Sequence, residues 1–112
     1  MKILHNPRCT KSRETLALIE AAGKDVKVIE YLKEPPTEGE LADILAKLGM
    51  KAEDLVRKNE DLYKDKFKGK TLTEKQWISQ MAANPVLIER PIVISGSKAV
   101  LGRPPENVKA LL

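Results

Sequence analysis

The chain has few of the side chains that most often reveal a function. Among its 112 residues are one cysteine, one histidine, and four aromatic residues: one Trp, two Tyr and one Phe. A single cysteine excludes an intramolecular disulfide. One histidine and one cysteine are also too few for an ordinary zinc site, so we expect no bound metal. The scattered aromatic residues offer no platform on which bases could stack, so we expect no nucleic-acid partner.

Long apolar runs are also missing. No stretch approaches the roughly 18 apolar residues of a membrane span, and the opening Met1–Leu4 is too short for a signal peptide. We therefore expect no membrane partner and a cytoplasmic location, where a lone cysteine is either inert or a reactive nucleophile. The length predicts a single domain over residues 1–112, which we expect to be a monomer. The net charge of +4 mildly favours anionic partners.

The most informative stretch surrounds the cysteine. Ile3-Leu4 predicts the end of a short buried strand, and Asn6-Pro7 breaks that strand because proline lacks an N–H. From Thr10 onward, apolar residues recur at helical spacing. Cys9 is thus predicted at the N-terminus of a helix, where free N–H groups and the helix dipole favour an anion such as a thiolate.

Three cations, Arg8, Lys11 and Arg13, crowd this predicted turn. The first turn of a helix normally carries acids instead. A bound anion would explain the departure. The alternative is an ordinary buried cysteine beside solvated cations.

The remaining chain predicts an α/β protein with a helical insertion. We expect strands at 26–32, 92–94 and 99–101, the last two forming an antiparallel hairpin, and flanking helices at 10–22 and 106–112. The insertion spans about 37–84, with capping boxes at Thr37/Glu40 and Thr73/Gln76. Trp77 and Met81 lie on an apolar helix face there and are expected in the core. The order β-α-β, insertion, β-β-α is typical of a thioredoxin-like fold with a four-stranded mixed sheet.

The sequence resembles the ArsC family, thioredoxin-fold arsenate reductases that use glutathione and glutaredoxin. The resemblance covers nearly the whole chain in order. The segments that carry it are His5-Asn6-Pro7-Arg8-Cys9 with Ser12-Arg13, then 31–37, 55–59 and 84–93, and Gly102-Arg103-Pro104-Pro105-Glu106. Two departures are Thr10-Lys11, where the family usually has Gly-Thr, and a chain shorter than the operon-encoded reductases.

The resemblance implies a site. It makes Cys9 the nucleophile and places arginines around the oxyanion substrate, here Arg57, Arg90 and Arg103. His5 would help keep the thiol ionised. The candidate substrate-binding residues are Thr10, Ser12, Arg13 and Pro91, of which Pro91 would be the cis-proline of the fold. Ser12 could donate to the Cys9 sulfur or merely sit in the first helical turn.

The resemblance also implies partners: arsenate as substrate, glutathione as cosubstrate and glutaredoxin, with no bound cofactor. Guanidinium groups suit a tetrahedral oxyanion because they bind it bidentately and offset its repulsion of a thiolate. The absence of a second cysteine favours an external thiol.

Two alternatives remain open from the residues. One is a regulator of the Spx type that binds RNA polymerase, although Ser12 here prevents the usual C-x-x-C switch. The other is a glutathione-dependent thiol oxidoreductase with another substrate. Each arginine, taken singly, could also be a solvated surface residue.

Overall fold

The computed structural model describes residues 1–112, and the chain divides into two compact units. A sheet unit combines Met1–Glu34 with Arg90–Leu112, and a helical unit comprises Pro35–Glu89. The helical unit contains the predicted insertion of residues 37–84. Whether the chain folds as a single domain stays a prediction. None of its helices has the length and apolar character needed to cross a membrane.

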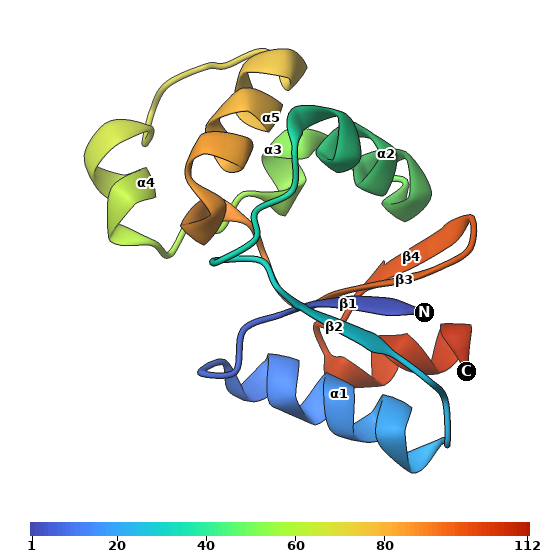
Figure 1. Ribbon diagram of the computed structural model, residues 1–112. Coiled ribbons are helices and arrows are strands. Elements are labelled where there is room, and N and C mark those ends of the chain that lie inside the picture. Colours follow the sequence, from blue (N-terminus) through green and yellow to red (C-terminus); the bar gives the residue numbers. More distant parts are fainter. The chain divides into compact units, whose positions relative to one another are not determined.

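The sheet unit contains four strands in the order β2-β1-β3-β4 (Figure 1). Strand β1 pairs in parallel with β2 and antiparallel with β3, which in turn pairs antiparallel with β4. This mixed sheet confirms the predicted β-α-β and β-β arrangement. The strands are Lys2–His5 (β1), Lys27–Glu30 (β2), Ile92–Ser95 (β3) and Lys98–Leu101 (β4).

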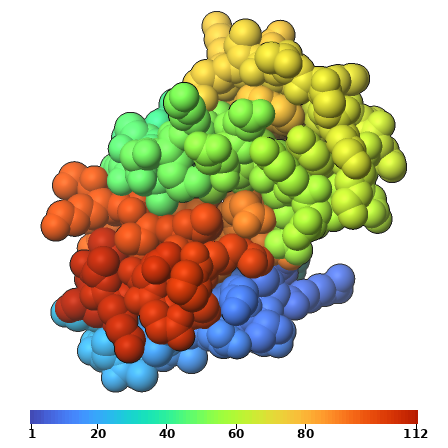
Figure 2. Space-filling view, turned by 180° about the vertical axis from the view of Figure 1, so that it is seen from behind, coloured from blue at the N-terminus to red at the C-terminus, as the bar shows by residue number.

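Two helices lie on one face of this sheet: α1 (Thr10–Ala21) and η2 (Pro105–Leu111) (Figure 1). They lie side by side, and Figure 2 shows the red C-terminal segment next to the blue N-terminal one. A buried cluster joins both helices to the sheet: Ile3, Ile19, Val93 and Val108. Because Leu4 pairs with Ile92 in the register, the loop after β1 lies next to the segment that enters β3.

One element differs from the prediction. Strand β2 is shorter than the expected 26–32 because the N–H groups of Lys33 and Glu34 both bond to the Glu30 carbonyl and turn the chain. The predicted terminal helix is present at Pro105–Leu111, as a 3-10 helix. The Asn107 side chain donates to the carbonyls of Leu101 and Arg103 at its start.

The helical unit is built from helices whose starts match the sequence signals. Both predicted capping boxes are present, Thr37 with Glu40 and Thr73 with Gln76. The first helix ends at Gly49, whose φ of +67° favours glycine. The helices are α2 (Glu38–Leu48), α3 (Ala52–Leu55), α4 (Asp61–Lys66), α5 (Glu74–Ala83) and η1 (Pro85–Leu87).

Trp77 is the centre of the apolar packing in this unit. It is 2% exposed, and Met81 on the same helix is fully buried, which confirms their predicted place in the core. Tyr63 stacks on the Trp77 ring at 6.3 Å between centroids, and Phe67 packs at 5.6 Å. The charged segment 58–70 contains the short helix α4, and Tyr63 and Phe67 pack it against Trp77 of α5.

Candidate active site

Cys9 is the N-cap residue of α1, at the turn between β1 and the helix, as the sequence predicts. Its N–H donates to the Asn6 carbonyl at 3.0 Å, and its own carbonyl accepts from the Arg13 N–H at 3.0 Å. Its side chain is 9% exposed. No acid occupies the first turn of α1, so no carboxylate competes with the sulfur for the positive end of the helix dipole.

The pKa of Cys9 lies below its ordinary value. Burial acts against ionisation and raises the pKa. It is outweighed by the Ser12 backbone N–H, by a hydrogen bond and charge from the Arg90 guanidinium, and by the charge of Arg103. The Cys9 side chain forms no capping hydrogen bond with the helix. The Ser12 backbone N–H lowers the pKa of Cys9 because it stabilises the ionised sulfur.

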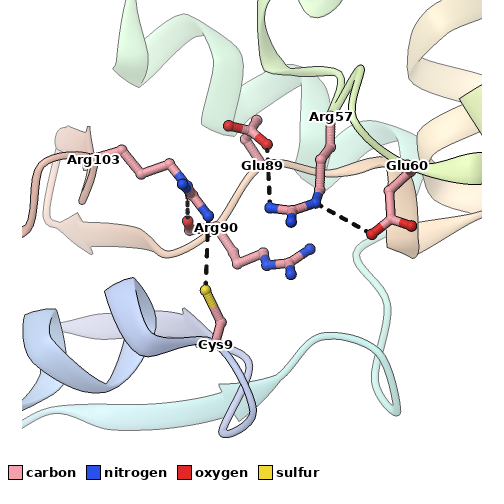
Figure 3. Close-up of polar contacts among 6 residues, drawn as sticks. All are labelled: Cys9, Arg57, Glu60, Glu89, Arg90 and Arg103. Atoms are coloured by element: carbon pink, nitrogen blue, oxygen red, sulfur yellow. Dashed lines mark hydrogen bonds and ion pairs between the residues drawn. The ribbon is translucent and has the colours of Figure 1, made fainter.

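Two arginines of the sheet unit meet at this sulfur. Arg103 donates from Nε to the Arg90 carbonyl at 2.7 Å and from Nη2 to the Cys9 sulfur at 3.7 Å (Figure 3). Both arginines precede a cis peptide bond, at Pro91 and at Pro104. The expected cis-proline at Pro91 is therefore present. The segments that enter β3 and leave β4 together carry guanidinium groups to the turn that holds Cys9.

Gly102 explains how these two segments come so close. Its N–H donates to the Pro91 carbonyl at 2.8 Å, and its own carbonyl lies 3.4 Å from the Thr15 hydroxyl, which donates to the Lys11 carbonyl at 2.8 Å. A Cβ at this position would lie 2.6 Å from Thr15 Oγ1 and 2.8 Å from Pro91 Cγ. Only glycine fits without displacing a neighbour, and the next residue is Arg103.

His5 does not hydrogen-bond to the cysteine. Its Nδ1 lies 2.6 Å from the hydroxyl of Ser12, and this hydroxyl also accepts from the Asn6 N–H at 3.0 Å. The pKa of His5 lies below its ordinary value, mainly because burial disfavours the charged ring; Glu30 opposes this shift, and Arg13 reinforces it. His5 therefore supports the turn as a neutral ring. The Ser12 hydroxyl is bound to His5 and Asn6, and the Ser12 backbone N–H is the group that stabilises the sulfur.

The cations predicted to crowd the turn play a different part from the one expected. Arg8 and Lys11 are exposed. Arg13 is exposed too and donates to the Pro7 carbonyl at 3.0 Å and to the Thr10 hydroxyl at 3.3 Å, so it braces the loop. None of these three cations is among the causes that shift the pKa of Cys9. The sequence could not show this, because the effective arginines lie near the other end of the chain.

Arg57 belongs to the helical unit, directly after α3. Its N–H donates to the Leu87 carbonyl at 2.7 Å. Its guanidinium pairs with Glu60 at 3.2 Å and with Glu89 at 3.7 Å (Figure 3). Sequence reasoning missed both carboxylates as partners. The spacing of three between Arg57 and Glu60 is a signal that could have found one of them.

The structure contains no group of three or more His, Cys, Asp or Glu side chains placed to hold a metal ion. Sequence reasoning also missed the parts of Asn6, Thr15 and Gly102. The Asn6-Pro7 pair was a turn signal, and the Asn6 side chain does accept the Arg8 N–H at 3.0 Å. Nothing in the sequence alone pointed to the contact between Thr15 and Gly102.

Comparison with known proteins agrees with this geometry. The sheet has the thioredoxin-like order, and the cysteine lies at its first strand-to-helix turn. The ArsC family model matches residues 4–111, so the chain belongs to the ArsC family.

Three similar proteins match it along nearly their full lengths. "Uncharacterized protein YfgD" of Escherichia coli K12 is 48% identical over 110 residues, which cover 96% of this chain and 92% of that one. An arsenate reductase of Neisseria meningitidis serogroup A is 44% identical over 114 residues, covering 100% and 97%. The solved structure of an arsenate reductase from Vibrio cholerae is 42% identical, with a TM-score of 0.93 and coverage of 100% and 98%. The thioredoxin-like fold class is thereby confirmed.

Proposed function

We propose that this protein is an arsenate reductase that attacks arsenate with the Cys9 thiolate and takes its electrons from glutathione, with glutaredoxin. The observation that carries the proposal is the Cys9 sulfur, whose pKa is lowered and which accepts from Arg103 at 3.7 Å. Membership of the ArsC family and the 44% identity to the Neisseria arsenate reductase support arsenate as the substrate.

The arginines address the main obstacle to this reaction. Arsenate is a tetrahedral anion, so an approaching thiolate is repelled by charge. Guanidinium groups bind such anions through two parallel hydrogen bonds and remain charged at every physiological pH. Arg90 and Arg103 would thus stabilise the thiolate before arsenate binds and the oxyanion afterwards. The same role for Arg57 rests on its sequence motif.

In the first step the Cys9 sulfur forms a bond to arsenic, and one arsenic–oxygen bond breaks. The departing oxygen leaves as water after it gains two protons. Arsenic remains in its +5 state in the resulting thioarsonate. The backbone N–H groups at the start of α1 face the growing negative charge, which is the arrangement that such a transition state requires.

In the second step a glutathione thiolate attacks the Cys9 sulfur. A sulfur–sulfur bond forms, the sulfur–arsenic bond breaks, and its electron pair stays on arsenic, which is reduced to arsenite and takes up protons. The Cys9–glutathione disulfide is then reduced by a second thiol, from glutaredoxin or glutathione, and Cys9 returns as a thiolate. The chain has one cysteine, so the second sulfur must come from outside it. A reducing compartment such as the cytoplasm suits this cycle.

The supporting residues have smaller parts in the proposal. Neutral His5 holds the Ser12 hydroxyl, so the first turn of α1 presents its N–H groups to the sulfur. Arg13 and Thr10 brace the loop from the solvent side. Pro91 places the Arg90 segment, and through Gly102 it also places Arg103.

The test is arsenate-dependent consumption of NADPH, coupled through glutathione reductase, with glutathione and glutaredoxin present. The wild-type protein should turn over arsenate, and Cys9→Ser should have no activity above the uncatalysed rate. Lys24→Gln, an exposed change just beyond the far end of α1, serves as the control and should keep full activity. Disulfide reduction without arsenate turnover would instead support the thiol oxidoreductase, and turnover that persists in Cys9→Ser would overturn the assignment of the nucleophile.

A further inference from the structure

A cavity of about 410 Å³ lies in the sheet unit beside the loop that carries Cys9. It lies between the end of β1 and the end of β2, two parallel neighbours in the sheet. Its size falls in the range of sites for small ligands. The lining residues are His5, Asn6, Pro7 and Arg8 from the loop, and Glu30, Leu32 and Lys33 from the β2 end.

His5 gives this cavity a hydrogen-bond donor. The side chain is only 6% exposed, and its Nδ1 is occupied by Ser12. The Ser12 hydroxyl accepts from the Asn6 N–H, so its own proton is available to the Nδ1 of a neutral ring. On this basis we assign the ring proton to Nε2. This nitrogen forms no hydrogen bond within the chain and is the polar atom that His5 can offer to a ligand.

Arg8 gives the cavity a free cation. Its backbone N–H is fixed by the Asn6 side chain at 3.0 Å, but its guanidinium forms no hydrogen bond or ion pair. Lys33 is different, because it pairs with Glu30 at 3.6 Å. The available groups are therefore one guanidinium and one imidazole N–H, both of which favour a carboxylate. Pro7 and Leu32, which is 44% exposed, add apolar surface next to them.

We propose that this cavity binds a carboxylate of the peptide thiol that reduces the Cys9 adduct. The inference rests on the proposed function, in which a second thiol must reduce the Cys9 adduct. Glutathione has the matching chemistry: a thiol on its central residue and a carboxylate at each end of a short backbone. Pro7 and Arg8 directly precede Cys9, so a ligand held there lies along the loop of the nucleophile. Arg90 and Arg103 lie at the sulfur itself, where the proposed function has them bind the oxyanion.

The direct test uses S-methylglutathione, which has both carboxylates but cannot react with Cys9. Titrated into the ¹⁵N-labelled protein, it should shift the amide signals of residues 5, 6 and 8 and of residues 30–33. Arg8→Gln should weaken binding about tenfold, the usual effect of losing one charge-assisted contact. Lys11→Gln is the matched control, because it removes the same charge from an exposed residue two positions beyond Cys9 that does not line the cavity. The diethyl ester of S-methylglutathione should bind as weakly to the wild type as the free acid binds to Arg8→Gln.

Equal weakening by Arg8→Gln and Lys11→Gln, or shifts confined to other residues, would overturn the inference. In the turnover assay Arg8→Gln should raise the KM for glutathione about tenfold and leave the KM for arsenate unchanged. Arsenate turnover with an unaltered KM for glutathione would reject this site and keep the proposed function. Binding at the cavity without arsenate turnover would keep the site and reject the oxyanion chemistry.

Discussion

The longer helices of the two units, α2 and α5 in one and α1 in the other, begin in opposite ways. In the helical unit α2 and α5 start with capping boxes and have acids in their first turns, Glu38 and Glu40 in one and Glu74 in the other. In the sheet unit α1 starts at Cys9 with no capping hydrogen bond from a side chain and no acid. At the start of α2 and α5, side chains accept hydrogen bonds from the free helical N–H groups and stabilise the helix. At the start of α1 these groups are available to stabilise a sulfur anion.

The arginines differ between the units in a similar way. Arg57 is paired with two carboxylates of its own unit, Glu60 and Glu89. Arg103 instead donates to a backbone carbonyl and to the Cys9 sulfur of its own unit, and Arg90 also acts on that sulfur. Within the helical unit the cation is held by carboxylates, whereas within the sheet unit two cations act on one thiol. The sheet unit therefore concentrates positive charge at one atom.

The largest expected effect comes from removing that charge. Arg103→Ala should lower kcat/KM for arsenate by about 10²–10³, the usual effect of losing one positioned donor at a developing anion. It should also raise the pKa of Cys9, measured by thiolate absorbance against pH. Arg13→Ala, which removes an exposed arginine that only braces the loop, should change both quantities much less. Equal losses in the two variants would mean that only overall charge matters.

The next effect concerns the position of Arg103. Gly102→Ala should destabilise the fold by about 1–3 kcal/mol, because the added methyl overpacks Thr15 and Pro91. As the segment moves away, the pKa of Cys9 should also rise. Gly39→Ala is the contrasting variant, since its Cβ would meet nothing closer than 4.0 Å inside α2. It should stabilise the protein by about 0.5–1 kcal/mol. Urea unfolding measures the change in stability of both variants. A Gly102→Ala protein that keeps the wild-type stability and an unchanged thiol pKa would contradict the argument.

A smaller effect tests the caps directly. Thr37→Ala should reduce the free energy of unfolding by about 1 kcal/mol, because it leaves the Glu40 N–H without its acceptor. Cys9→Ala removes no capping hydrogen bond and should cost less in urea unfolding at a pH where the thiol is neutral. A larger loss for Cys9→Ala than for Thr37→Ala would show that α1 depends on its N-cap residue as α2 does.

The smallest effect concerns pH and His5. The pKa of His5 is lowered in the folded state, so below about pH 6.5 the unfolded chain binds a proton that the folded chain resists. Stability contributed by the neutral ring is present above that pH and is lost as the pH falls toward the lowered pKa. In His5→Gln this part of the pH dependence should disappear, as measured by urea unfolding from neutral pH down through the lowered pKa. Identical pH dependence of the free energy of unfolding in the two proteins would show that folding does not lower the pKa of His5.

Much of the fold could be predicted because its signals are local. The capping boxes at Thr37 and Thr73, the glycine after α2 and the hairpin of β3 and β4 all formed where neighbouring residues indicated them. The predicted end of β2 was wrong, because two N–H groups bond to the Glu30 carbonyl and turn the chain there.

The sequence by itself determined that Cys9 begins a helix, because a strand, a proline and a helical pattern follow one another within a few residues. Family resemblance, and not any local pattern, pointed to Arg57, Arg90 and Arg103, of which the structure places Arg90 and Arg103 at the sulfur. Only the tertiary structure decided that Arg90 and Arg103 lower the pKa of the thiol and that Arg8, Lys11 and Arg13 do not. The reason is physical: electrostatic influence falls with distance and exposure, and sheet pairing brings residues from the far end of the chain to the sulfur, while its neighbours in sequence point into solvent.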